Sequence, residues 1–210
     1  MKRTLGILLL VVPAVLAAQP LRVVNVNAPA VNHVFSPSGV VTVTDTTAPI
    51  WGGGFLQSRY YQALPGSPAA GKYVYEYRVD LRNSVGTLAI GAITSITVNF
   101  GPNVGTLDFN GDHMADDVFV VTSGGLGSVG LSSAVRSVNS ITFNFAGGGV
   151  AQGGSPGRGQ SSYFFGIVST HPKRNVTVSA ANTLGPPLSL AGWAPAYLIL
   201  PPPGGIRKKP

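Results

Sequence analysis

The sequence predicts an all-β protein: a single β-sandwich of jelly-roll or immunoglobulin-like type with about ten strands. A β-barrel is the alternative. Charged residues make up only 10% of the chain and Glu occurs once, so the charged outer faces typical of helices are missing. Glycine and proline are frequent, at 28 and 17 residues, and they separate short runs rich in Val, Thr, Ile, Phe and Tyr. Short strands joined by many turns are therefore expected.

Several of these runs alternate apolar and polar residues, which is the period of a strand with one buried face. The clearest is KYVYEYRVDL, residues 72–81, where tyrosines and aliphatic residues share one face. The other face carries Lys72, Glu76, Arg78 and Asp80, so we expect a half-buried strand. The runs VFVV and SYFFGIV are apolar on both faces, as in central strands. Further predicted strands are ITSITVNF, SITFNF, NVTVSA, LRVVNV, GVVTV, GFLQSRYY, TLAIGA and AYLIL.

The N-terminus has the pattern of a secretory signal peptide, predicted over residues 1–18. Lys2 and Arg3 precede an apolar run that ends at small residues, and the run is too short for a membrane span of about 20 residues. A β-sandwich domain is predicted over 19–200 and a disordered Pro/Gly/basic tail over 201–210. We expect no membrane span in the mature chain, a secreted or cell-surface location, and a bacterial source.

The residue types argue against nucleic-acid binding and against catalysis. The formal net charge is +7, but five positive charges lie at the two ends of the chain and the rest are scattered. The three histidines are isolated in sequence, so no nucleophile with a neighbouring base is apparent. We therefore expect a protein that is not an enzyme. A hydrolase that uses Asp45 or Glu76 is the third hypothesis, because Asp45 could approach Glu76 or Asp80 in the fold.

The stretch DFNGDHMADD, residues 108–117, holds four of the 7 acidic residues of the chain. Oxygen-bearing side chains on alternate residues suit calcium, which takes six to eight oxygen ligands. The spacing predicts a Ca²⁺ site, and a plain Asn/Asp/Gly turn is the alternative. The predicted ligands are side chains and one backbone carbonyl, that of Met114: Asp108, Asn110, Asp112, Met114, Asp116 and Asp117.

This stretch resembles the calcium loops of FG-GAP repeats and of dockerin or thrombospondin-like modules, over the pattern DxNxDxxxD at 108–116. His113 occupies a position that is usually Gly in those loops, where a left-handed backbone is expected. The resemblance implies a calcium-stabilised loop followed by an apolar strand.

A second, looser resemblance lies in GQSSYFFGIVS, residues 159–169, which is similar to a strand of exported bacterial proteins of the PEP-CTERM kind. The C-terminal LPPPGGIRKKP keeps prolines and basic residues but lacks the Glu and the membrane span of their sorting tail. This resemblance implies a role at the cell surface or in the extracellular matrix.

We therefore expect an exported surface or matrix structural protein that assembles with itself, as a homo-oligomer or filament. The alternative is a carbohydrate-binding module that binds surface glycans. That alternative depends on aromatic side chains that could stack on sugars, namely Trp51, Tyr60 and Tyr61. These aromatics could equally be core residues of the sandwich.

Overall fold

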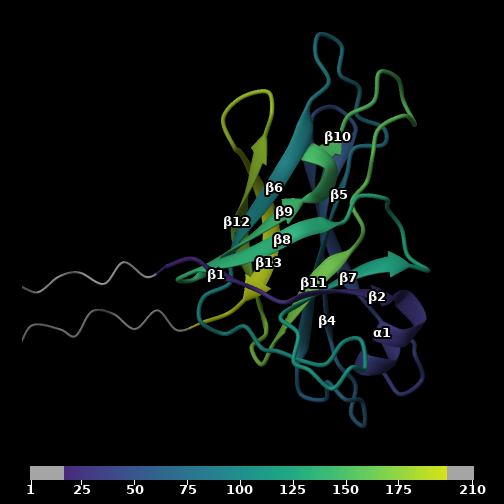
Figure 1. The fold of residues 1–210 in the computed structure, drawn as a ribbon, viewed down its shortest axis with the longest axis vertical. Coiled ribbons are helices and arrows are strands. Elements are labelled where there is room, and N and C mark those ends of the chain that lie inside the picture. The colour runs from purple at the N-terminus through teal and green to yellow at the C-terminus, as the bar shows by residue number, and fades with distance from the viewer. Residues whose placement is uncertain (1–16, 198–210) are drawn as a thin grey trace, which may run out of the picture.

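The computed structural model describes residues 17–197, which form two β-sheets packed face to face (Figure 1). This confirms the predicted all-β sandwich. Neither sheet closes into a barrel within these residues. Most of the predicted signal peptide, the predicted tail at 201–210 and the end of AYLIL lie outside the described residues.

The first sheet has the strand order β1-β8-β9-β6-β12-β13, and β10 pairs with β6. All its pairs are antiparallel. A single turn of 3-10 helix, η1 (Ala146–Gly148), follows β9. The strands are β1 (Gln19–Pro20), β6 (Ala92–Asn99), β8 (Leu131–Ser137), β9 (Ser140–Phe145), β10 (Val150–Ala151), β12 (Lys173–Asn182) and β13 (Leu188–Pro195).

The second sheet has the order β2-β7-β11-β5-β4-β3. Strands β2 and β7 are parallel, and the other pairs are antiparallel. The strands are β2 (Val23–Asn27), β3 (Thr44–Ile50), β4 (Gly54–Gln62), β5 (Tyr73–Asp80), β7 (Val118–Ser123) and β11 (Phe165–Ser169).

Aromatic side chains fill the space between the sheets. Tyr77 of β5 is fully buried, and its ring lies within 6.2 Å of those of Phe100, Phe143 and Phe165. Its hydroxyl donates a hydrogen bond to the backbone carbonyl of Trp193 in β13, so one side chain joins both sheets. Buried aromatic surface and a satisfied hydroxyl together stabilise this core.

One helix, α1 (Ala28–Phe35), covers part of the outer face of the second sheet (Figure 1). The side chain of Asn27 caps its first turn by accepting from the Ala30 amide at 3.1 Å, and Pro29 stands in that turn, where proline is tolerated. Phe35 packs against Tyr61 and Phe119 of the sheet, each with ring centroids 5.6 Å away. The second sheet is therefore buried on both faces near α1.

Two predicted strands are wrong. GVVTV lies before β3, in a segment that joins no sheet, and TLAIGA is a loop between β5 and β6, of which only Ala92 is in a strand. Strong β propensity does not suffice where no neighbouring strand is available to pair. The TLAIGA loop lies at the end of the sandwich opposite to α1 (Figure 1).

Candidate functional site

The acidic loop, residues 108–117, lies between β6 and β7 and is closed by backbone hydrogen bonds between Leu107 and Asp116 in both directions. The carboxylate of Asp108 accepts from the amides of Gly111, Asp112 and His113 at 2.6–3.1 Å. His113 has a φ of 65°, which is the left-handed backbone expected at this position. Asp108 therefore organises the loop by binding its amides.

Arg22, which precedes β2, supplies a positive charge to this loop. Its guanidinium lies 2.5 Å from Oδ2 of Asp112 and 2.8 Å from Oδ1 of Asp116, and its amide donates to Oδ2 of Asp117 at 2.8 Å. Asp116 is fully buried, and burial raises the pKa of its carboxyl. A hydrogen bond from Asn110 and one from the Met114 amide lower the pKa of Asp112.

The predicted calcium ligands are therefore close in space but engaged with the chain itself. Both oxygens of Asp108 accept amides, and Arg22 lies between Asp112 and Asp116. Within residues 17–197, no group of three or more His, Cys, Asp or Glu is arranged to hold a metal ion. In this arrangement the guanidinium of Arg22 occupies the space between two of the predicted ligands, Asp112 and Asp116, and calcium binding stays a prediction.

The three predicted sugar-stacking aromatics do not lie on one surface. Tyr60 and Tyr61 are neighbours on β4 and point to opposite faces of the second sheet. Tyr60 stacks on Tyr73 with ring centroids 5.6 Å apart, whereas Tyr61 is only 3% exposed under α1. Trp51 lies in the turn between β3 and β4, at the other end of β4, and is half-buried.

The outer face of the second sheet carries charged residues, among them three that were predicted on the exposed side of a half-buried strand, Glu76, Arg78 and Asp80. Strand pairing aligns Asp45, Arg59 and Glu76 in one row across β3, β4 and β5. In the next rows, Gln57 lies beside Arg78, and Asp80 follows. We call this set the charged face: Asp45, Gln57, Arg59, Glu76, Arg78 and Asp80. The expectation of a solvated face was wrong, because Glu76, Arg78 and Asp80 are 3–7% exposed.

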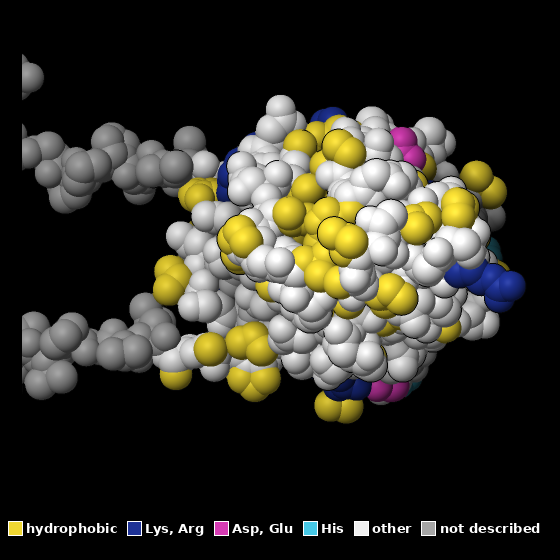
Figure 2. All heavy atoms as spheres, turned by 90° about the horizontal axis from the view of Figure 1, so that it is seen from above, with side chains coloured by type: hydrophobic (Ala, Val, Ile, Leu, Met, Phe, Trp, Pro, Cys, Tyr) yellow, Lys and Arg dark blue, Asp and Glu magenta, His cyan; other side chains and the backbone are white. Residues whose placement is uncertain are grey.

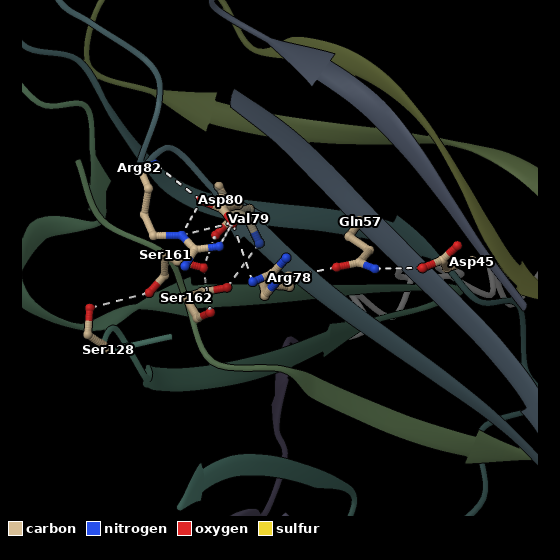
Figure 3. A network of polar contacts seen from close by, with 9 residues as sticks. All are labelled: Asp45, Gln57, Arg78, Val79, Asp80, Arg82, Ser128, Ser161 and Ser162. Atoms are coloured by element: carbon tan, nitrogen blue, oxygen red, sulfur yellow. Dashed lines mark hydrogen bonds and ion pairs between the residues drawn. The ribbon is translucent and has the colours of Figure 1, made fainter. Parts of the chain in front are cut away.

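One part of the charged face is a continuous chain of polar contacts (Figure 3). Gln57 donates to Asp45 at 2.7 Å and accepts from Arg78 Nε at 3.2 Å. Arg78 lies 3.3 Å from Asp80 Oδ2, which also binds Arg82 at 2.6 Å. Burial acts to raise the pKa of Asp80, but the hydrogen bonds from Arg82 outweigh it and the pKa is lowered. These charges therefore compensate one another inside the protein.

Comparison of this chain with protein-family models, with curated proteins and with solved structures gives no match. No helix within residues 17–197 is long and apolar enough to cross a membrane.

The end of the sandwich opposite to α1 exposes apolar side chains. Leu88 is 101% exposed, Ile90 59% and Leu184 49%, and together with Trp51 and Val85 they form what we call the apolar end surface. Figure 2 looks onto this end and shows hydrophobic side chains gathered over its middle, with charged side chains near the rim. A hollow of about 300 Å³ lies here, and no charged side chain of the described chain lines it. Two side chains of the apolar end surface, Leu88 and Ile90, come from the TLAIGA segment that was wrongly predicted as a strand.

Proposed function

We propose that the chain is an exported bacterial protein with a structural role at the cell surface or in the extracellular matrix, and that it self-associates through the apolar end surface. The observation that carries the proposal is the full exposure of Leu88 beside Ile90 and Leu184. Large apolar side chains gathered on a soluble β-sandwich mark an interaction site. Export is supported by the signal-like N-terminus.

A second copy of this chain is the partner that fits the surface best. The hollow has no charged lining residue, so it requires no charge of opposite sign from a partner. An uncharged apolar patch can face its own copy across a two-fold axis, where each residue meets the equivalent patch. Homotypic contact at one end of the sandwich gives dimers, and a second contact elsewhere would extend them into filaments.

Sedimentation velocity over a range of protein concentrations tests the self-association. We expect a concentration-dependent oligomer for the secreted protein and a monomer for the double variant Leu88→Ser, Ile90→Thr. Val40→Thr is the matched control, because Val40 is 67% exposed in the segment between α1 and β3 and lies outside the apolar end surface. A monomer at all concentrations for the unaltered protein would contradict the proposal.

Export is tested separately by the mass of the protein secreted from a bacterial host. Processing after residue 18 would leave Gln19 as the first residue. A full-length mass with all protein retained in the cytoplasm would contradict export, and would leave the sedimentation result unaffected.

Carbohydrate binding is a second candidate, favoured by the position of Trp51 in the hollow of the apolar end surface. Gln152, whose side-chain nitrogen donates to Ser84 Oγ at 2.8 Å, also lines this hollow, and an exposed indole ring is a surface on which sugars stack. A glycan array compares the unaltered protein with Trp51→Ala. Signal that is lost in the variant supports this candidate, and an array without signal contradicts it.

A further inference from the structure

A second cavity, of about 300 Å³, lies on the outer face of the second sheet and is separate from the apolar end surface. Its walls come from α1, from Val41 and Val43 of the mispredicted GVVTV segment, and from the loop at 124–126. Its floor is formed by the sheet, with Arg59, Glu76 and Phe164. A concave, mostly apolar site with few converging polar groups is the usual form of a small-molecule site.

Arg59 is the cation of this cavity. A guanidinium has five N–H donors, and within residues 17–197 the buried Nε of Arg59 has no hydrogen-bond partner. Its Nε is fully buried, and its one ion pair, with Oε2 of Glu76, is long at 3.9 Å. The guanidinium carbon lies 3.8 Å from the centroid of the Phe164 ring, which fixes its plane. The buried Nε is costly to leave unpaired, whereas the side chain as a whole is 26% exposed and can be reached by a ligand.

The neighbours of Arg59 already have partners. Oε1 of Glu76 accepts from the hydroxyl of Tyr61 at 2.8 Å, and both residues are buried. Arg78 shares the Phe164 ring from 5.0 Å, but its charge is matched by Asp80. The cavity therefore offers one planar, partly exposed cation beside one carboxyl group.

We infer that this cavity binds a small amphipathic monocarboxylate, whose carboxylate pairs with Arg59 and whose apolar part contacts Val31, Val41 and Val121. A planar carboxylate matches the fork of a guanidinium in a bidentate contact. A doubly charged phosphate fits less well, because Glu76 lies beside the same guanidinium. At about 30 Å³ for each water-sized group, 300 Å³ holds about ten non-hydrogen atoms, which is the size of one ring or a short branched chain.

The test uses nitrogen-15 NMR titration of the full secreted protein with benzoate, 3-phenylpropionate and 4-methylpentanoate, each to about 10 mM. We expect at least one acid to bind and to shift the amides of the cavity-lining residues. The matching alcohol, such as 3-phenylpropan-1-ol for 3-phenylpropionate, should bind at least tenfold more weakly. Phenyl phosphate should also bind more weakly than the acid.

Two variants assign the binding to this cavity. Arg59→Gln removes the cation, and Val41→Phe fills the cavity while leaving Arg59 unchanged, which covers the case that Arg59→Gln does not fold. Val40→Phe is the matched control, since the adjacent Val40 is exposed and does not line the cavity. We expect the first two variants to bind the acid at least tenfold more weakly than the unaltered protein. The control variant should bind it with unchanged affinity. No binding by any of the three acids, equal binding of the alcohol, or unchanged binding by Val41→Phe would overturn the inference.

Discussion

The acidic loop and the charged face together hold all 7 acidic side chains of this protein, in different environments. The loop crowds its carboxylates at an exposed turn and stabilises them by backbone amides and by Arg22. The charged face spreads alternating charges over three strands and buries Glu76, Arg78 and Asp80, whereas Asp45 at its edge is exposed. The carboxylates that are close in sequence are thus bound mainly by local amides, with only Asp116 fully buried, whereas strand pairing brings Glu76 and Asp80 into buried contact with side chains of other strands.

The largest expected effect separates the two regions directly. Asp80→Ala leaves the buried guanidinium of Arg78 without its ion partner and should lower the free energy of unfolding by about 3–5 kcal/mol. Asp112→Ala removes an exposed carboxylate and should change it little. Urea unfolding monitored by tryptophan fluorescence measures both variants. An equal loss of unfolding free energy in Asp80→Ala and Asp112→Ala would contradict the claim that burial makes the two regions differ.

The second prediction concerns the cation of the acidic loop. Arg22→Ala leaves the buried carboxylate of Asp116 without a cation and should cost about 1–3 kcal/mol in chelator. If the loop binds calcium, the melting temperature rises with calcium, by the equivalent of about 2.7 kcal/mol at a hundredfold excess over the Kd. Asp108→Ala combined with Asp112→Ala should then abolish the rise. Equal melting temperatures in calcium and chelator would contradict the calcium prediction and leave Arg22 as the counter-charge.

How much of this could be predicted from the sequence differs between the two regions. The loop was apparent, because its carboxylates lie within ten residues, and the left-handed His113 was expected. Arg22 was not predicted, since it is 90 residues from Asp112 and only the pairing of β2 with β7 brings it there. Long-range contacts of this kind leave no local pattern.

The charged face was missed for a different physical reason. Alternation in KYVYEYRVDL correctly placed Tyr75 and Tyr77 in the core, but it could not show that the opposite face is also covered. Helix α1, which forms a wall of the cavity beside Arg59 and Glu76, was not predicted, although Asn27 as a cap followed by Pro29 is its signal in the sequence. Because the helix was not predicted, the cavity was not predicted either.

A smaller effect distinguishes the carboxyl groups within the charged face. Burial raises the pKa of Glu76, so its folded-state pKa lies above the unfolded one. The stability that this shift contributes is present below the unfolded pKa and is lost as the pH rises through the folded pKa. The unaltered protein should therefore lose stability relative to Glu76→Gln between about pH 4 and pH 7. Urea unfolding at both pH values measures this, and a constant difference would contradict it.

The most direct test of the proposed self-association uses the absence of cysteine from the chain. A single Leu88→Cys variant carries one thiol on the apolar end surface, and a disulfide between two copies forms only where Cα atoms come within about 7 Å. The account predicts rapid disulfide-linked dimers on mild oxidation for Leu88→Cys, and slow or none for Val40→Cys at equal concentration. Equal, slow crosslinking of both variants would contradict the proposal that this end meets a second copy.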